Sequence, residues 1–185
     1  MAVGDTAQII SSGTMSGNSV SLTSIPQTFS HLELTVNGCY DDSGTQSNWL
    51  YYKFNGTTTS EYGIFGGRIY NGTNGTISSQ TYGNASGNYF TGFPGTNKDI
   101  YSNGISKLRI MNYSNTTSQK PILIDGRHVH YVSSSDKADR LLTSVGVYPT
   151  TTTSLMAAGI STIDITGAGS LTFKSGTRYM LIGWP

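Results

Sequence analysis

Charge and helix-forming residues are scarce in this sequence. Charged residues make up 11% of the 185 residues, where soluble domains average about 25%. The net charge is +1 and the basic residues are scattered, so the chain lacks the basic patch that binds a nucleic-acid backbone. Glu occurs only at Glu33 and Glu61. Since long amphipathic helices are built largely from Glu, Ala, Lys and Leu, the composition excludes an all-α fold.

A second cysteine and a long apolar run are also missing. Cys39 is the only cysteine, which excludes an internal disulfide and fits synthesis in a reducing cytoplasm. No stretch approaches the roughly 18 apolar residues of a membrane span. Residues 1–13 lack the basic start and apolar stretch of a signal peptide. We therefore expect neither a membrane nor a nucleic acid as a partner.

Small polar residues take the place of the missing charge. Ser, Thr, Asn and Gly supply nearly half of the chain, and 12 Tyr, 6 Phe and 2 Trp accompany them. The aromatic residues provide a core that disordered chains lack. At roughly 150 residues per domain, the length predicts one domain. We expect an N-terminal extension over residues 1–16 and a single β-sandwich domain over residues 17–185.

Alternation of apolar and polar residues recurs along the chain. It is clearest over residues 31–37, where Leu32, Leu34 and Val36 share one face of an expected strand. About eight to ten short strands without helical blocks favour an antiparallel β-sandwich or barrel, and a jelly roll is the first choice. The other expected strands cover residues 19–25, 49–54, 64–70, 105–113, 120–132, 141–147, 159–165, 170–173 and 178–182.

The segments between these strands carry their own signals. Asn55 and Gly56 predict a tight turn, and the strands at 105–113 and 120–132 predict a hairpin. Residues 136–140 have the composition of one helical turn. Residues 71–97 are rich in Gly, Asn, Thr and Tyr and predict a long loop with at most one weak strand.

No motif of a known catalytic mechanism occurs in the sequence. We therefore expect no catalytic residue, no cofactor and no metal site. His128 and His130 share one face of an expected strand and offer two imidazoles to one metal ion. Two ligands are too few for a site, so a solvated pair is the favoured interpretation.

Four aromatic residues of the long loop are candidates for partner binding. Tyr82, Tyr89, Phe90 and Phe93 lie among small polar residues, a mixture that recognition surfaces favour. The alternative is that their rings pin a Gly-rich loop onto the sandwich or onto a neighbouring subunit. His128 and His130 complete the set of candidate partner-binding residues.

Several short sequence landmarks extend over most of the chain. They are residues 25–34, 53–56 with Tyr62, 110–117 with Lys120, 175–176 and 179–183. Together they resemble a family of small virion structural proteins from tailed phages, particularly phages of aquatic bacteria including cyanobacteria. The resemblance implies a jelly-roll protein on the phage particle with no catalytic residues. The aromatic stretch 82–93 and the strand around His128 lie outside the landmarks and are candidates for partner specificity.

Two functions follow from this resemblance. The first is a decoration or cement protein that binds the major capsid protein or other virion proteins, with a homotrimer as the symmetric expectation. The second is a tail-associated module that binds a host glycan or surface protein. The expected domain starts near Met1, without the coupling region or shaft of a tail fibre, so we favour decoration of the virion. An enzyme is less favoured, because a depolymerase needs paired carboxylates and the spacing of the acidic residues does not show such a pair.

Overall fold

A computed structural model describes most of the chain as β-strand. One short helix, α1 (Thr153–Met156), is present among the described residues. The described backbone covers residues 6–41, 47–57, 61–71, 76–85, 89–94, 103–133, 136–167 and 171–185. Side chains are described for residues 6–41, 49–57, 61, 63, 103–127, 143–167 and 171–185.

The larger of two sheets has eight strands, and all neighbouring pairs are antiparallel. Across the sheet, the order is β1 (Gln8–Thr14), β12 (Arg178–Trp184), β3 (His31–Gly38), β8 (Asn103–Met111), β9 (Lys120–Ser133), β10 (Asp136–Tyr148), β5 (Tyr62–Asn71) and β6 (Thr76–Ala85).

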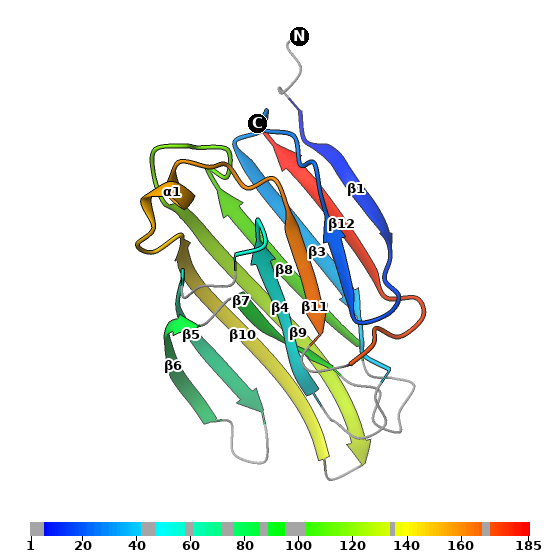
Figure 1. The fold of residues 1–185 in the computed structure, drawn as a ribbon. Helices are drawn as coiled ribbons and strands as arrows, with labels where there is room; N and C mark the ends of the chain where they lie inside the picture. The colour runs from blue at the N-terminus through cyan, green and yellow to red at the C-terminus, as the bar shows by residue number, and fades with distance from the viewer. Residues whose placement is uncertain are drawn as a thin grey trace.

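The smaller sheet has four antiparallel strands and forms a second layer. In Figure 1, β4 and β11 of this sheet cross in front of the larger sheet, and α1 lies at one end of the molecule. The chain is therefore an all-β antiparallel sandwich, as the composition and the alternation predict. The order of the smaller sheet is β2 (Ser19–Leu22), β11 (Ile163–Gly167), β4 (Ser47–Phe54) and β7 (Tyr89–Pro94).

The core fills the space between the two sheets. On β3, Leu32, Leu34 and Val36 are buried, which confirms the face predicted from the alternation. Leu34 is paired with Leu108 of β8 and with Leu181 of β12, and all three side chains are almost fully buried. The smaller sheet contributes further buried side chains, namely Leu22, Leu50, Tyr52, Phe54, Ile163 and Ile165.

Buried tyrosine hydroxyls in this core have polar partners. The hydroxyl of Tyr52 lies 2.5 Å from Oγ of Ser106, and that of Tyr148 lies 2.7 Å from Oγ1 of Thr57. Burial raises the pKa of both tyrosines. Because each hydroxyl keeps a hydrogen bond inside the protein, its burial does not leave an orphaned polar group.

Two sequence predictions about local structure are wrong. Residues 136–140 do not form a helical turn, because they belong to β10 and pair with β9, and Asp139 and Arg140 also pair with β5. Residues 71–97 contain two full strands, since β6 pairs with β5 and β7 pairs with β4. In both segments, the hydrogen bonds to neighbouring strands outweigh weak local preferences.

Both ends of the chain also differ in detail from the sequence expectations. Part of the expected N-terminal extension is the edge strand β1, which pairs with β12. The only large apolar residues of β1 are Ile9 and Ile10. Because they are adjacent, the sequence has no alternation of apolar and polar residues there that would predict a strand. In the segment expected to be a strand at 170–173, Phe173 forms an isolated bridge with Tyr40, while residues 168–170 lie outside the described part.

The Asn55–Gly56 turn is present as predicted, and its amide fastens a distant loop. Asn55 adopts a φ of 49° and Gly56 a φ of 65°. The Asn55 side-chain amide donates to the Gly159 carbonyl at 2.9 Å. Its Oδ1 accepts from the backbone N–H groups of Ser161 at 2.9 Å and Thr162 at 3.1 Å. One side chain therefore ties the β4 end to the segment before β11.

Replacing Asn55 separates the side-chain contribution from the backbone contribution. Asn55→Gly keeps the left-handed backbone accessible but loses the amide contacts, so we expect about 2 kcal/mol less stability. Asn55→Ala also incurs the left-handed strain, which adds about 1 kcal/mol. Urea unfolding of the two variants and the wild-type protein measures both contributions. Equal stability of all three proteins would show that the turn does not hold the loop.

Glu61 fastens the segment after β10 from a buried position. Its carboxylate accepts backbone N–H bonds from Thr151 at 2.9 Å and Thr152 at 3.1 Å. Hydroxyls of Thr150, Thr151 and Thr152 also donate to it. These hydrogen bonds, with that of the Thr151 N–H foremost, outweigh the opposing effect of burial and lower the Glu61 pKa to about 2.

Glu61 should therefore make stability depend on pH in the acid range. Because its folded pKa is depressed, its contribution is complete above its unfolded pKa of about 4.3 and is lost as the pH falls toward 2. Glu61→Gln should be less stable than the wild-type protein at pH 7, and the difference should shrink between pH 4.5 and pH 2. Urea unfolding at several pH values tests this, and a difference that stays constant with pH would contradict it.

Candidate interaction face of the eight-stranded sheet

Exposed large hydrophobic side chains lie on one side of the molecule. Within the part of the chain whose side chains are described, all of them come from the outer face of the eight-stranded sheet. Side chains on a strand alternate between the two faces, so these residues alternate with the buried ones of the same strands. They are Ile9 of β1, Ile105 of β8, Val145 of β10, and Met180 and Trp184 of β12.

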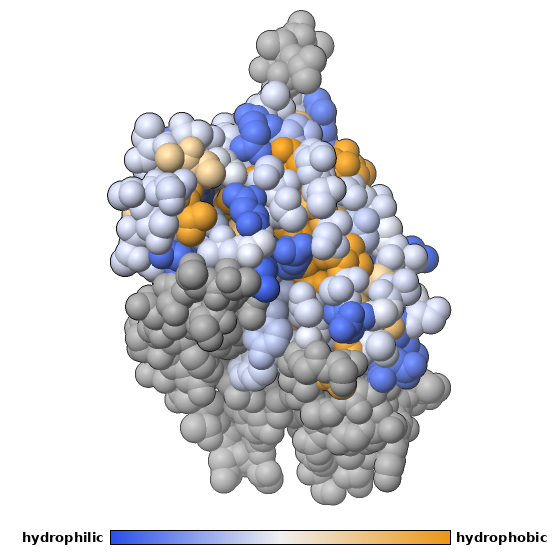
Figure 2. All heavy atoms as spheres, viewed as in Figure 1, coloured by the Kyte–Doolittle hydropathy of each residue, from blue (hydrophilic) through white to orange (hydrophobic). Residues whose placement is uncertain are grey.

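Figure 2 shows the molecule from the side of the four-stranded sheet, where most of the coloured residues are pale or blue. The main orange group lies over the area that β2, β11 and β12 occupy in Figure 1. There, a hollow of about 340 Å³ opens between β1 and β2, lined partly by the core residues Leu22, Ile25 and Leu181. Its apolar atoms therefore belong to the edge of the core.

Strand register assembles a continuous row across the outer face. Glu33 of β3 is paired on one side with Ile182 and on the other with Arg109. The pairs continue to Ile9 beyond Ile182, and to Leu123 and Val145 beyond Arg109. Apolar side chains therefore flank a charged centre on both sides.

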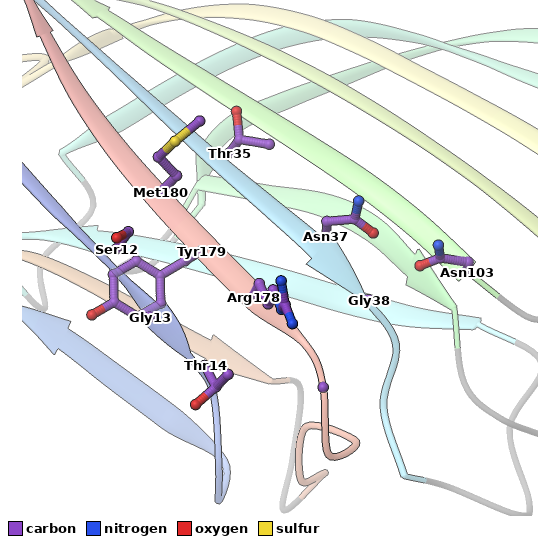
Figure 3. Close-up of a pocket in the computed structure, with 11 residues that line it drawn as sticks. Ser12, Gly13, Thr14, Thr35, Asn37, Gly38, Asn103, Arg178, Tyr179 and Met180 are labelled. Atoms are coloured by element: carbon purple, nitrogen blue, oxygen red, sulfur yellow. The ribbon is translucent and has the colours of Figure 1, made fainter. Parts of the chain in front are cut away.

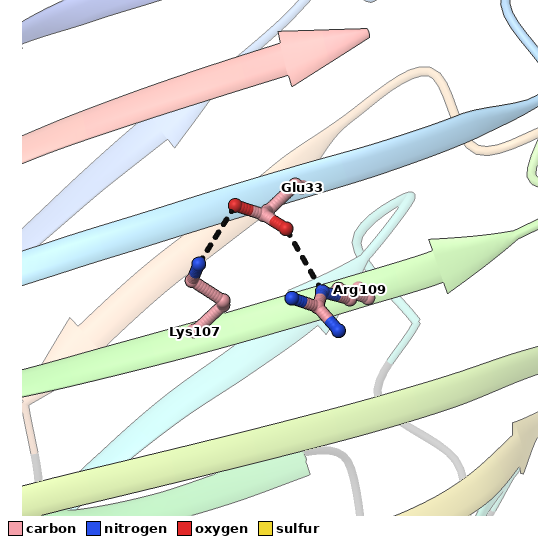
Figure 4. Close-up of polar contacts among 3 residues, drawn as sticks. All are labelled: Glu33, Lys107 and Arg109. Atoms are coloured by element: carbon pink, nitrogen blue, oxygen red, sulfur yellow. Dashed lines mark hydrogen bonds and ion pairs between the residues drawn. The ribbon is translucent and has the colours of Figure 1, made fainter. Parts of the chain in front are cut away.

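The charged centre is a carboxylate held between two cations. Oε1 of Glu33 lies 3.0 Å from Nζ of Lys107, and Oε2 lies 2.8 Å from Nε of Arg109 (Figure 4). Burial by itself would raise the Glu33 pKa. The hydrogen bonds and charges of Arg109 and Lys107 outweigh this effect and lower the pKa. Glu33 is therefore ionised at neutral pH.

Positive charge is in excess on the described part of this face. Four cations and two carboxylates occupy outward positions. One carboxylate, Glu33, is shared by two of the cations. The other, Asp125, accepts a hydrogen bond from Oγ1 of Thr143 at 3.1 Å. The cations are Lys107, Arg109, Arg127 and Arg178, and the carboxylates are Glu33 and Asp125.

An apolar notch of about 200 Å³ opens beside the charged centre. Trp184 on its border is 42% exposed. Nδ1 of His31 is buried and has no hydrogen-bond partner among the described residues. The notch is lined by His31, Leu32, Glu33, Arg109, Met111 and Trp184.

A larger and more polar hollow lies at the other end of β3 and β12. Its volume is about 840 Å³, and Figure 3 shows side chains from β1, β3, β8 and β12 around it. The lining side chains include hydroxyl and amide groups and one guanidinium. These groups suit a polar ligand or a polar loop of a partner. The polar side chains are Ser12, Thr14, Thr35, Asn37, Asn103, Arg178 and Tyr179.

The candidate partner-binding residues from the sequence do not come from one strand. Tyr82 lies on β6, opposite Ile64 of β5. His128 and His130 lie together on β9, opposite Arg140 and Ala138 of β10. Their side chains are outside the described residues.

The remaining three aromatic candidates lie on the smaller sheet. Tyr89, Phe90 and Phe93 belong to β7 and pair with residues of β4. Their side chains are also outside the described residues. The strands therefore distribute the aromatic candidates over both sheets, with Tyr82 apart from the other three.

The sequence reasoning missed the outer-face residues. Ile105, Lys107, Arg109 and Met111 alternate with buried residues on β8, but the alternation identifies only the inward apolar face. Trp184 lies beyond the end of the strand expected at 178–182. The sequence did contain one signal for this face, because apolar residues of β8 occur at outward as well as inward positions of the alternation.

The landmarks that carry the family resemblance fasten loops at one end of the sandwich. Nε2 of Gln27 donates to the carbonyls of Ile25 at 2.9 Å and Ile160 at 3.0 Å. The buried Lys120 donates to the Met156 carbonyl at 2.9 Å, and burial lowers its pKa. The hydroxyl of Tyr113 donates to the Pro26 carbonyl. These residues are explained by the fold and form no separate site.

Removing the central carboxylate should weaken the fold in a salt-dependent way. Glu33→Gln leaves Lys107 and Arg109 as neighbouring cations, so we expect about 0.5–1 kcal/mol less stability at low salt. The loss should shrink in 1 M salt, because salt screens exposed charges. Asp125→Asn is the matched control on the same face and should show a smaller effect. Urea unfolding at both salt concentrations tests this, and equal losses at both would contradict it.

Comparisons with known proteins add no further identity. No protein-family model matches the chain, and neither a curated protein nor a solved structure matches it. Within the described ranges, no group of three or more His, Cys, Asp or Glu residues is placed to hold a metal ion. The same part of the chain contains no helix with the length and apolar character needed to cross a membrane.

Proposed function

We propose that this chain is a structural protein of a tailed-phage particle that decorates and cements the capsid shell. The observation that carries the proposal is the gathering of exposed large hydrophobic side chains on the outer face of the eight-stranded sheet. Exposed apolar side chains gathered on one face of a sheet mark a protein-interaction surface. The choice of a tailed-phage particle is supported by the sequence landmarks, which resemble small virion proteins.

The strand order supports a jelly roll as the finer description of the sandwich. Without β5, β6, β9 and β10, the layers read β1-β12-β3-β8 and β2-β11-β4-β7. This order arises when a long hairpin with the pairs β1–β12, β2–β11, β3–β8 and β4–β7 is rolled up. Rolling then brings β12 against β3 and β11 against β4. Jelly rolls occur in viral capsid proteins and in lectins.

The proposed role needs binding and no chemistry. Contacts made only with the assembled shell stabilise the shell by mass action. The partner is the major capsid protein or another virion protein, and the chain is made in the cytoplasm of the bacterial host. A homotrimer fits a threefold position of the shell.

A second candidate is a tail-associated module that binds a host glycan or surface protein. The polar hollow of about 840 Å³ favours it, because hydroxyl, amide and guanidinium groups are suited to hydrogen-bond a sugar. Lectins are also jelly rolls. The two candidates differ in where the chain is located and in how many copies a particle carries.

The copy number of this chain per purified particle separates these functions. Quantitative mass spectrometry against the major capsid protein measures it without knowledge of a ligand. We expect a number comparable with that of the capsid protein, because a cement protein covers the shell. A handful of copies would place the chain on the tail and favour receptor binding. Absence from the particle would contradict both candidates.

A further inference from the structure

The notch beside Trp184 has the size of a single side chain. Its volume is about 200 Å³, and a cavity of about 150 Å³ already accommodates benzene. Met111 and Trp184 give it apolar walls, and it opens on the outer face. An apolar side chain of a partner, such as Leu or Phe, therefore fits there.

The guanidinium of Arg109 lies at the rim of the same notch, and only one of its three nitrogens donates a hydrogen bond to Glu33. Its Nε donates to Glu33, and its side chain is 45% exposed. Figure 4 draws a bond to Glu33 from Nε alone, and no described residue accepts a hydrogen bond from the two terminal nitrogens. A guanidinium fork binds a carboxylate through two parallel N–H bonds. The free side of Arg109 is therefore arranged for a carboxylate.

The charge of the face selects the kind of partner. Four cations against two carboxylates on the described part of the face favour an acidic partner surface. A second copy of this chain is disfavoured, because a twofold contact through the same face would bring two surfaces with excess positive charge together. The occupant of this face is therefore an acidic protein surface rather than a second copy.

We infer that the shell surface under this face inserts one apolar side chain between Trp184 and Met111 and pairs an adjacent carboxylate with Arg109. This inference rests on the proposed function and names the anchor of its contact. Trp and Arg are among the residues most enriched at binding hot spots. The ion pair with Glu33 holds Arg109 in place before the partner arrives, so less side-chain freedom is lost on binding.

The test is binding of the purified protein to phage shells stripped of it. We expect Trp184→Ala and Arg109→Glu each to weaken binding about 30-fold, which corresponds to a hot spot of about 2 kcal/mol. The matched controls are Lys53→Glu of β4 and Leu155→Ala of α1, which lie outside the outer face, and each should change binding less than threefold. Ile9→Ala and Arg178→Glu change the same face away from the notch, and each should weaken binding less than the notch variants do. Circular dichroism and urea unfolding show which variants remain folded.

Two conservative variants keep the test decisive if a primary variant unfolds. Trp184→Phe retains an aromatic wall and should bind close to the wild-type protein. Arg109→Lys retains the charge beside Glu33 but loses the fork, so it should lie between the wild-type protein and Arg109→Glu. A wild-type level of binding for Arg109→Lys would exclude two-bond recognition of a carboxylate and overturn the inference.

The outcomes separate this inference from the proposed function. If the wild-type protein binds shells and the notch variants bind equally well, the inference is wrong and the cement function stands. The inference is also wrong if Ile9→Ala and Arg178→Glu lose as much binding as the notch variants, because the energy is then spread over the face. If the wild-type protein does not bind stripped shells, the cement function fails and the inference fails with it.

Discussion

The pairing register of β3 with β8 and β12 is the constraint on which both faces of the larger sheet depend. In this register, Leu34 lies between Leu108 and Leu181 in the core, while Glu33 lies outside between two cations. A slip of one residue would exchange the faces. It would bury the Glu33 carboxylate without its partners and expose the leucines, so the core and the interaction face are fixed together.

The outer face combines an ion cluster with exposed apolar side chains, and neither contributes much to the stability of the isolated domain. The ion cluster of Glu33, Lys107 and Arg109 stabilises the chain modestly, because exposed pairs contribute little. The exposed Val145 and Trp184 contribute little to the core, which the inward side chains already fill. Their apolar area becomes favourable when a partner removes it from water. The stability of the chain and the proposed affinity for a partner are therefore located on opposite faces of one sheet.

Local patterns predicted the parts of the fold that local chemistry determines. The buried face of β3, the turn at Asn55 and the β8–β9 hairpin follow from alternation and turn residues. The strand at residues 136–140 does not, because its pairing with β9 and β5 overrides weak local preference. The candidate interaction face could not be predicted from the sequence either. The notch joins Arg109 to Trp184, and only the arrangement of β3, β8 and β12 brings these residues together.

The strands β9, β10, β5 and β6 widen the larger sheet beyond the four strands β1, β12, β3 and β8. Strands lie about 4.8 Å apart and rise about 3.4 Å per residue. Four strands of the length of β3, which has eight residues, would offer roughly 14 Å by 27 Å, or about 400 Å². Eight strands extend the width to roughly 34 Å and the area to about 900 Å². A stable interface buries about 800 Å² of accessible surface per partner, so the four added strands supply the larger part of the sheet area that a partner of that size would cover.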